Sequence, residues 1–332
     1  MRAPGFWYAP VERPGLLARM LTPLGWLYGL ATARRLRRPG YSAGVPVICI
    51  GNLGAGGAGK TPTVIALALR LVARGLDVHI VSRGYGGSLP GPVRVEELHH
   101  SAAEVGDEPL LLSSMLPVWV ARDRAAGVRA AEAAGAQVIL MDDGFQNPAV
   151  KPALSLVVVD AAKGFGNGRM IPAGPLREPV GAGLARADLV LAIGDAAAQA
   201  GFRAEWGDKI PVPVMTGALC PLATGMDWQG SRLLAFAGIA DPSRFFATLR
   251  SLGTDVVRGE ALPDHAPLSE ALLRRLLAEA KAKDAELVTT EKDAARLPPA
   301  WRAKVLVLVV RLEIDDWGPL DAGLARLGLS GP

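Results

Sequence analysis

The chain is poor in cysteine and histidine and has no strong excess of charge of either sign. Among its 332 residues are four histidines and two cysteines, Cys49 and Cys220. Two distant cysteines form neither a disulfide framework nor a metal-binding pair, and a reducing compartment is the simplest interpretation. The net charge of +4 is too small to indicate nucleic acid as a partner.

Long hydrophobic runs are also missing, although half of the residues are hydrophobic and a fifth are charged. That composition predicts a sizeable core and excludes global disorder. The charge-free stretch at 20–33 is shorter than the ~18 residues that a membrane-spanning helix needs, and Pro23 interrupts it. A helix that crosses a bilayer is therefore not expected in this segment.

The N-terminal segment instead favours a helix that lies on a membrane surface. Its large side chains can form one apolar face, made of Leu16, Leu17, Met20, Leu21, Leu24, Leu27 and Tyr28, with Trp26 at the level of the headgroups. The basic residues that follow could meet anionic lipid heads, namely Arg34, Arg35, Arg37 and Arg38. The alternative is an ordinary helix packed on the protein core. We predict that residues 1–40 form a membrane-surface helix and a basic segment.

The strongest positive signal is a glycine-rich loop between an apolar strand and a helix. The strand is the β-branched run that starts at Val45, and a helix is expected from Thr61 to Ala73. The loop between them fits the P-loop pattern G-x-x-x-x-G-K-[ST] and consists of Gly54, Ala55, Gly56, Gly57, Ala58, Gly59, Lys60 and Thr61. Backbone N–H groups and the helix N-terminus favour phosphate there, Lys60 can reach the outer phosphates, and the Thr61 hydroxyl can ligate Mg²⁺.

Apolar runs and helical stretches alternate after this loop, which argues for a parallel sheet covered on both faces. Strands are expected at 77–82, 117–121, 138–142, 154–160 and 187–193. A second series begins at Arg232, with strands at 286–290 and 305–310. We predict a P-loop NTPase-like α/β fold with a mostly parallel sheet, a P-loop domain at 41–224, and a smaller α/β domain at 225–332.

Functional groups in such sheets collect at the carboxyl ends of the strands. Asp142 and Asp143 end one apolar strand, as expected of a carboxylate that holds Mg²⁺ or its water. In "SRGYGG", Arg83 could contact phosphate or sugar, or the segment could be a simple turn. Asp107, taken alone, is best interpreted as an acidic residue at a helix start.

Three further segments carry candidate groups. "GNGRMIPAGPLREP" from Gly166 contains Arg177 and Glu178 and is too irregular to be only a connector. His265 in "LPDHAPLS" is a lone histidine, which is usually a surface or core residue. The Lys292–Asp293 pair in "TTEKDAARL" lacks the N-K-x-D spacing with which many GTPases recognise guanine.

Taken in order, these motifs resemble tetraacyldisaccharide 4′-kinase, the lipid A 4′-kinase family. They are "GNLGAGGAGKTP", "SRGYGG", "GDEP", "DDGFQ", "PAGPLREP", "AGIADPSRF", "PDH" and "TTEKDAARLP". The resemblance runs to about Leu297. It implies that ATP and Mg²⁺ are used to phosphorylate the 4′-hydroxyl of an acylated glucosamine disaccharide 1-phosphate, giving lipid IVA in lipid A biosynthesis. It also implies a peripheral enzyme on the cytoplasmic face of the inner membrane, whose second domain closes over the cleft.

The resemblance also implies roles for individual residues. Lys60 would neutralise the β- and γ-phosphates, and Asp107 would form an acid–base pair with His265 that accepts the proton of the sugar hydroxyl. The remaining assignments are Thr61 as a Mg²⁺ ligand, Asp142 and Asp143 for Mg²⁺ and catalysis, Arg177 at the transferring phosphate, Glu178 near the metal, and Tyr85 and Gln146 near the nucleotide or sugar.

One departure concerns the residues after His265, which are Ala266, Pro267 and Leu268 where the family often has a histidine or an aromatic residue. This departure bears on the substrate pocket and leaves the proposed pair intact. The alternatives to a lipid kinase are a P-loop switch or maturation GTPase, a membrane-interaction protein with a vestigial nucleotide site, and a soluble small-molecule kinase. The sequence does not indicate an oligomeric state.

Overall fold

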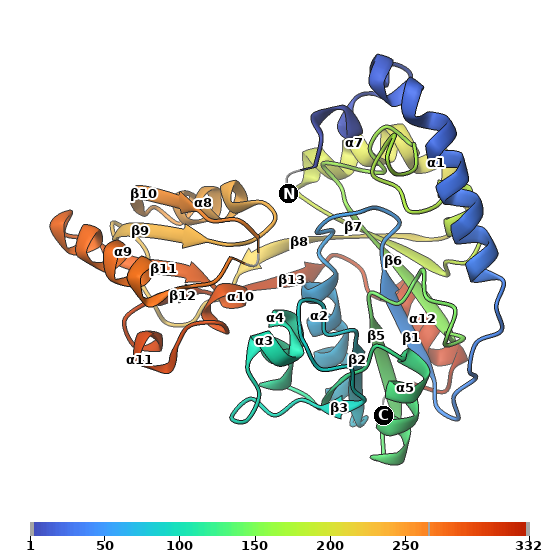
Figure 1. Ribbon diagram of the computed structural model, residues 1–332, viewed down its shortest axis with the longest axis horizontal. Helices are drawn as coiled ribbons and strands as arrows, with labels where there is room; N and C mark the ends of the chain where they lie inside the picture. Colours follow the sequence, from blue (N-terminus) through green and yellow to red (C-terminus); the bar gives the residue numbers. More distant parts are fainter. Residues whose placement is uncertain (1–2, 265, 330–332) are drawn as a thin grey trace.

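The computed structural model describes residues 3–264 and 266–329, which fold into two α/β units (Figure 1). Within these residues the first unit is built on a nine-stranded sheet of order β13-β8-β7-β6-β1-β5-β2-β4-β3. Its strands are β1 (Val47–Gly51), β2 (Val78–Ser82), β3 (Val93–Arg94), β4 (Val118–Val120), β5 (Val138–Asp142), β6 (Leu154–Asp160), β7 (Leu189–Ile193), β8 (Val214–Pro221) and β13 (Val310–Ile314). Strands β8 to β4 in this order are parallel, and only the edge strands β13 and β3 are antiparallel to their neighbours.

Helices cover both faces of this sheet, as a run of fully buried strands requires. One face packs under α2 (Lys60–Val72), α4 (Asp107–Ser113) and α12 (Gly318–Arg326), and the other under α5 (Arg124–Ala133), α6 (Val180–Leu184) and α7 (Ala196–Trp206). Successive residues of β1 enter opposite cores, with Ile48 and Ile50 on the first face and Val47 and Cys49 on the second. Short helices complete the unit: η1 (Gly5–Tyr8), α3 (Ala102–Val105) and η2 (Gly207–Lys209).

The second unit repeats the same layering on a smaller scale. Its parallel sheet, in the residues that are described, has the order β10-β9-β11-β12 and consists of β9 (Arg232–Ala237), β10 (Asp255–Ala261), β11 (Glu286–Thr290) and β12 (Leu306–Leu308). Helix α8 (Pro242–Ser251) covers one face, and α9 (Glu270–Ala282) covers the other. Two short helices, α10 (Glu291–Ala294) and α11 (Pro299–Arg302), follow β11. The mostly parallel α/β fold and the second α/β sheet are thus confirmed.

The chain returns to the first unit at its end. Residues 310–326 were expected in the second unit, but β13 pairs with β8 of the large sheet and α12 packs beneath it. The strand predicted at 305–310 is therefore two strands in two sheets. The apolar run through these residues gives no local sign that the chain passes from one sheet to the other. The strands with which β12 and β13 pair decide it.

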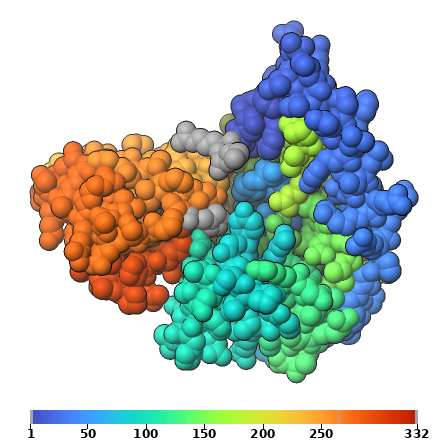
Figure 2. Space-filling view, in the orientation of Figure 1, coloured from blue at the N-terminus to red at the C-terminus, as the bar shows by residue number. Residues whose placement is uncertain are grey.

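Both crossings between the units are at β8 and the edge strand β13, which pair with each other. The chain enters the second unit after β8 and leaves it between β12 and β13, and the Leu222 N–H donates to the Val309 carbonyl at 2.9 Å, so the two crossings are joined. Figure 2 shows the orange second unit beside the blue-to-green first unit. Away from the crossings, α10 lies against α4.

The N-terminal helix α1 (Gly15–Leu36) packs through small residues and leaves its large apolar side chains exposed. Its buried positions are Ala18, Gly25, Gly29 and Thr32. A Cβ on Gly29 would lie 2.3 Å from the Met170 sulfur, so only glycine allows this approach. Among the described residues, no helix combines the length and apolarity needed to cross a bilayer.

Pro23 does not interrupt α1, contrary to the sequence-based expectation. Pro23 lies on the exposed side, and the carbonyl that loses its hydrogen bond belongs to Arg19, which is exposed as well. Water can solvate that carbonyl, so the proline costs the helix one backbone hydrogen bond and no buried polar group.

Candidate active site

The glycine-rich loop connects β1 to α2 as predicted. Helix α2 begins at Lys60, and its N-cap Gly59 has a φ of 93°, a left-handed conformation that favours glycine. A Cβ at Gly59 would also lie 2.7 Å from the Ile193 side chain. The sequence folds this way because the buried strand ends at the glycines and the amphipathic helix begins directly after them. Backbone N–H groups at the start of α2 are therefore available to an anion.

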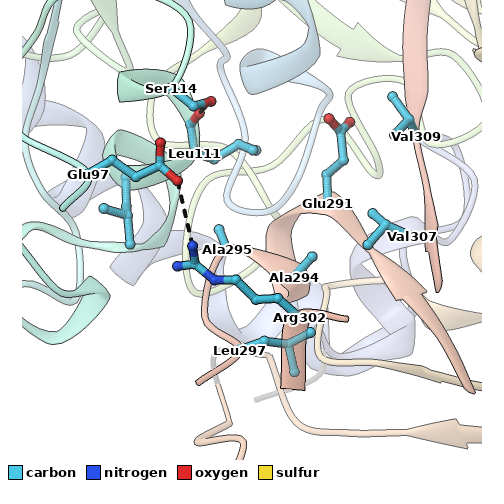
Figure 3. Close-up of a pocket in the computed structure, with 11 residues that line it drawn as sticks. Glu97, Leu111, Ser114, Glu291, Ala294, Ala295, Leu297, Arg302, Val307 and Val309 are labelled. Carbon is cyan, nitrogen blue, oxygen red and sulfur yellow. Dashed lines mark hydrogen bonds and ion pairs between the residues drawn. The ribbon is translucent and has the colours of Figure 1, made fainter. Parts of the chain in front are cut away.

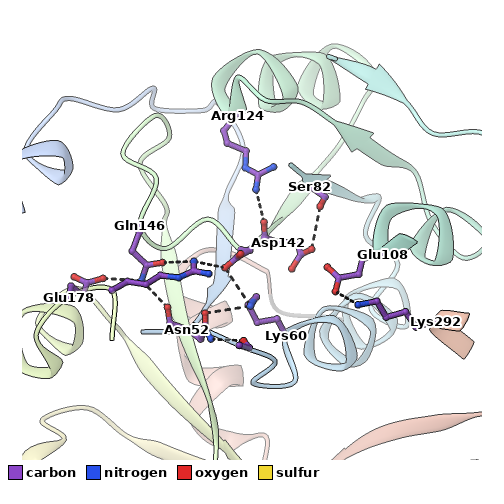
Figure 4. Close-up of polar contacts among 12 residues, drawn as sticks. Asn52, Lys60, Ser82, Glu108, Arg124, Asp142, Gln146, Glu178 and Lys292 are labelled. Atoms are coloured by element: carbon purple, nitrogen blue, oxygen red, sulfur yellow. Dashed lines mark hydrogen bonds and ion pairs between the residues drawn. The ribbon is translucent and has the colours of Figure 1, made fainter. Parts of the chain in front are cut away.

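Lys60 points toward a group of polar side chains at the carboxyl edge of the sheet (Figure 4). Its Nζ donates to Asn52 Oδ1 at 3.4 Å and lies 3.6 Å from Asp143 Oδ1. The Asn52 amide donates in turn to the Gly56 carbonyl at 3.3 Å. Asn52 therefore ties the lysine to its own loop. Asn52 was not among the site residues predicted from the sequence, although its place directly after a buried strand was a usable signal.

The irregular segment from Gly166 is hydrogen-bonded to the other side of the glycine-rich loop. The Ala55 N–H donates to the Pro175 carbonyl at 2.7 Å, and the Arg177 N–H donates to the Leu53 carbonyl at 2.8 Å. These bonds bring the Arg177 guanidinium to 3.6 Å from Asp143 Oδ1, the same oxygen that Lys60 approaches. The segment is more than a connector, because its backbone fixes an arginine beside the P-loop.

Gln146 and Glu178 lie behind Arg177. The Gln146 amide donates to the Asn52 carbonyl at 2.8 Å and to Glu178 Oε1 at 3.0 Å, and its oxygen accepts from Arg177 at 3.3 Å. Arg186 donates to Glu178 Oε2 at 2.6 Å. Each oxygen of Glu178 thus has a protein partner, which makes this side chain a support for Gln146 and Arg177 in this conformation.

Asp142 and Asp143 have opposite electrostatic environments although they are adjacent. Asp142 is buried and accepts from Ser82 at 3.3 Å. Burial raises its pKa to about 7, with repulsion from Glu108 adding to the effect. Burial acts against the ionisation of Asp143 as well, but Lys60, Arg177 and Arg124 outweigh it and hold its pKa below the ordinary value. The neighbouring cations therefore favour the anionic form of Asp143, while burial disfavours the anionic form of Asp142.

A buried arginine supports this pair. Arg124 is 2% exposed, and its guanidinium donates to the Asp142 carbonyl at 3.0 Å. The next residue, Asp143, adopts a φ of 52°, so the arginine is hydrogen-bonded to the carbonyl just before a residue in the left-handed conformation. Nothing in the sequence around Arg124 distinguished it from a surface residue on α5.

Substitution of Asp142 tests this electrostatic difference through stability. The folded-state pKa lies above the unfolded value of 3.8, so the folded state keeps a proton that the unfolded state loses, and stability falls as pH rises from about 4 to about 7. Asparagine has no proton to lose. The metal-free Asp142→Asn variant should therefore gain up to about 4 kcal/mol over the unmodified protein at pH 8 and show no such gain at pH 4, measured by urea unfolding.

Asp143→Asn is the matched control and should behave in the opposite way. Its depressed pKa stabilises the folded protein above the unfolded pKa, so asparagine should lower stability at pH 8. Destabilisation by Asp142→Asn at pH 8 would contradict the assigned environments.

Ser82, the last residue of β2, belongs to the site, and the loop that follows it carries Arg83 and Tyr85. Ser82 contacts Asp142, whereas the Tyr85 side chain is 71% exposed and Arg83 is exposed as well. The loop bonds to the segment before Asp107, with the Leu89 N–H donating to the Glu104 carbonyl at 3.0 Å. It therefore borders the site, and contacts of Arg83 and Tyr85 with substrate stay a prediction.

Asp107 occupies the first turn of α4, but the helix cap is Gly106, so the acid is not the capping residue. Asp107 is 7% exposed, and Arg296 of the second unit lies 3.4 Å from it. Glu108 faces Lys292 of the same unit at 3.5 Å. His265, the predicted partner of Asp107, lies outside the described residues. The structure thus brings Asp107 to the contact between the units.

The charged side chains of the "TTEKD" segment bind other groups of the protein. Asp293 is fully buried and accepts from the Gly238 N–H at 2.9 Å and from the Thr290 hydroxyl at 2.8 Å. Lys292 pairs with Glu108 and with Asp264 at 3.6 Å. This segment is therefore not arranged to recognise a guanine base.

The residues present fit a single divalent cation only in part. Asp142 Oδ1 is buried without a hydrogen-bond partner among the described residues, as suits an oxygen that faces a metal. Thr61 follows Lys60 at the start of α2, while Glu178 has both oxygens occupied. Among the residues described, no three His, Cys, Asp or Glu side chains form a metal-binding group. A cation here would depend on Asp142, Thr61 and its other ligands, such as phosphate oxygens and water.

A separate cavity of about 320 Å³ is lined by residues of both units (Figure 3). It is lined by Leu110, Leu111 and Ser114 of the first unit and by Ala294 and Arg302 of the second, among others. The Arg302–Glu97 ion pair, at 3.8 Å, closes one side. None of the predicted site residues that the structure describes lines it.

The chain is similar to proteins of one family over nearly its whole length. Residues 17–327 match the family model described as tetraacyldisaccharide-1-P 4′-kinase. A tetraacyldisaccharide 4′-kinase from Dinoroseobacter shibae is 61% identical over 329 residues, which cover 98% of each chain. One from Jannaschia sp. is 58% identical over 328 residues, covering 98% of this chain and 99% of the relative. The crystal structure of LpxK from Aquifex aeolicus in complex with ATP matches with a TM-score of 0.74 at 26% identity, covering 94% of this chain and 99% of that chain.

Proposed function

The chain belongs to the tetraacyldisaccharide-1-P 4′-kinase family, and on this premise we propose how its residues transfer a phosphoryl group from ATP to a lipid. It is an ATP-dependent kinase of lipid A biosynthesis. The 4′-hydroxyl oxygen of an acylated glucosamine disaccharide 1-phosphate forms a bond to the γ-phosphorus of ATP. The bond from that phosphorus to the β–γ bridging oxygen breaks, ADP leaves, and the hydroxyl proton passes to a base on the protein.

One observation carries the catalytic proposal: Lys60 and Arg177 converge from opposite sides on the same edge of the sheet, each 3.6 Å from Asp143 Oδ1. Phosphoryl transfer depends mainly on alignment and on neutralising the charge of the phosphate oxygens. Two fixed cations beside a glycine-rich loop provide this neutralisation. Asp143 attracts both cations to this position before the nucleotide enters.

The family implies Mg²⁺, and we propose that Asp142 and the Thr61 hydroxyl hold it, directly or through water. When bound, Mg²⁺ supplies charge neutralisation at the phosphates. The raised pKa of Asp142 is consistent with this role, because a carboxylate that is costly to ionise when buried is stabilised by a nearby cation. Glu178 stays a predicted neighbour of the metal, and its two oxygens already accept from Gln146 and Arg186.

We assign the base to Asp107 together with His265, as the resemblance implies. Asp107 lies at the contact with the second unit, and the segment that contains His265 belongs to that unit in sequence. Movement of the second unit about the joined crossings at Leu222 and Val309 would complete the site and exclude water, which limits wasteful hydrolysis of ATP.

The decisive experiment is transfer of ³²P from the γ-position of ATP to a purified tetraacylated disaccharide 1-phosphate in detergent micelles. We expect a product that carries the label at the 4′ position and a requirement for Mg²⁺. Label transfer to short, non-acylated sugars instead would favour a soluble small-molecule kinase. Binding of GTP in preference to ATP would favour the switch GTPase.

We further propose that α1 attaches the enzyme to the cytoplasmic face of the inner membrane. The exposed side chains of α1 include Leu16, Met20, Trp26 and Leu27, each more than 60% exposed. Large apolar side chains in such a row are unfavourable in water and favourable at the boundary between headgroups and acyl chains. An acylated substrate explains why the enzyme would work at this surface.

Vesicle binding tests the attachment. The protein should sediment with anionic vesicles at low salt and less so at high salt, because screening weakens contacts of arginine with lipid heads. The Leu24→Ser/Leu27→Ser variant should reduce partitioning by about tenfold or more, since two buried side chains are lost. The control Leu69→Ser/Leu98→Ser changes two exposed leucines outside α1 and should bind as the unmodified protein does. Equal loss in both variants would argue against α1 as the attachment site.

A further inference from the structure

Arg296 lies at the contact between the two units and touches three partners that come from different parts of the chain. Its Nε lies 3.4 Å from Asp107 Oδ2 of the first unit, its Nη1 donates to the Ala266 carbonyl at 2.9 Å, and its Nη2 pairs with Asp293. The arginine side chain is 8% exposed. A guanidinium has five N–H donors in a rigid fork, so these three contacts fix its orientation.

The orientation of Arg296 is set by the second unit. Asp293, its short-range partner, is fully buried and is held by the Gly238 N–H and the Thr290 hydroxyl at the ends of β9 and β11. A buried charge of this kind is stable only when it is paired, so Asp293 retains the arginine. The Nε edge of the guanidinium is then left to face α4.

The contact with Asp107 is an ion pair that is not yet a hydrogen bond. Arg296 Nε is buried and makes no hydrogen bond among the described residues, although Asp107 Oδ2 is 3.4 Å away. A small approach of the two units would turn this contact into a charge-assisted hydrogen bond. The neighbouring pair Lys292–Glu108, at 3.5 Å, would shorten in the same movement.

The third contact links the arginine to the segment that contains His265. The Ala266 carbonyl accepts from Arg296, and the Ala266 N–H donates to the Pro263 carbonyl at 3.0 Å, so the backbone on both sides of residue 265 is tied to this point. Lys292 adds a contact with Asp264 at 3.6 Å.

We propose that Arg296 is the positioning residue that assembles the catalytic base. Its Nε fixes Asp107, and its Nη1 fixes the backbone next to His265. The pairing with Asp293 sets the orientation of the guanidinium for both contacts. This inference rests on the proposed function of Asp107 and His265. It goes further because it names the group that joins the two halves of the base across the contact between the units. Arg296 itself touches no reacting atom.

Arg296→Met is the main test, with Arg302→Met as the matched control at the same contact. Arg302 also pairs across the units, with Glu97 at 3.8 Å, but it does not contact Asp107. Arg296→Met should lower kcat by at least about thirtyfold with KM for ATP changed less than about twofold, because small misplacement of a catalytic group is costly. Arg302→Met should change both constants less than about twofold.

A double-mutant comparison separates positioning from general damage. If Arg296 acts through Asp107, the loss caused by Arg296→Met should shrink to less than about threefold in an Asp107→Asn background. Arg296→Lys keeps the positive charge but not the planar guanidinium, and it should give an intermediate loss of kcat with an unchanged melting temperature. If Arg296→Met fails to fold, this variant carries the test. A full loss in the Asp107→Asn background, or equal activity of Arg296→Met and Arg302→Met, would overturn the proposal.

A readout without turnover distinguishes failure of this inference from failure of the proposed function. In ¹³C-histidine spectra of the full chain, the His265 signal is identified by its absence in His265→Gln. Arg296→Met should shift that signal at constant pH, whereas Arg302→Met should not. An unmodified protein that does not phosphorylate the disaccharide refutes the proposed function, while an unshifted His265 signal in Arg296→Met refutes the role of Arg296.

Discussion

Replacing Lys60 with alanine should lower kcat by at least about a hundredfold, because an oriented cation at the transferring phosphate commonly supplies several kcal/mol of transition-state stabilisation. Lys60 extends from the first turn of α2 and is held by Asn52 at 3.4 Å and Asp143 at 3.6 Å, so the charge is already oriented before the substrate binds. The measurement is steady-state transfer of phosphate to the acylated disaccharide, with ATP binding followed separately.

Lys304→Ala is the control, since Lys304 lies over the Trp301 ring in the second unit, away from the P-loop. It should leave kcat unchanged. Loss of the lysine also leaves Asp143 with fewer cationic partners, so folding of Lys60→Ala must be checked by its melting temperature. A folded Lys60→Ala protein with nearly normal turnover would show that Lys60 does not act on the transferring group.

The second large effect is expected for the pair Asp107 and His265. Each alanine substitution should lower kcat by about a hundredfold or more with little change in ATP affinity, because removal of a general base affects the chemical step. If the two residues act as one unit, the double variant should be little slower than the slower single variant.

Additive losses in the logarithm of kcat would argue against a unit, even when each single variant is slow. Glu108→Ala is an informative control for Asp107→Ala, because it lies next to Asp107 in α4 and pairs with Lys292 rather than Arg296. It should slow the reaction far less than Asp107→Ala does. Equal effects of Glu108→Ala and Asp107→Ala would indicate that the contact between the units matters and the base does not.

Much of the first unit could be predicted because its signals are local. A β-branched run, a glycine-rich loop and an amphipathic helix follow one another between Val45 and Val72, and each is defined by residues only a few positions apart. The same holds for Asp142 and Asp143 at the end of β5. The alternation of strands and helices then predicts the parallel sheet, since a strand that returns in parallel needs a crossover.

Other features of the site depended on which side chains meet in space. Ser82 bonds to Asp142 because β2 and β5 are neighbours in the sheet. Arg124 supports the same strand end from a helix on the other side of the core. The sequence spacing of these residues carries no sign of such contacts, because strand order and helix docking are properties of the whole fold.

The sequence by itself determined the P-loop, the carboxylates at the end of β5 and the existence of a second α/β series, since short-range patterns encode elements. Only the tertiary structure decided that residues 310–326 return to the large sheet, that Glu178 is occupied by Gln146 and Arg186, and that Arg296 faces Asp107. Long-range hydrogen bonds and ion pairs are selected by the packing of completed elements. An apolar run specifies burial, but the choice between two sheets that could bury it is made by the partner strands.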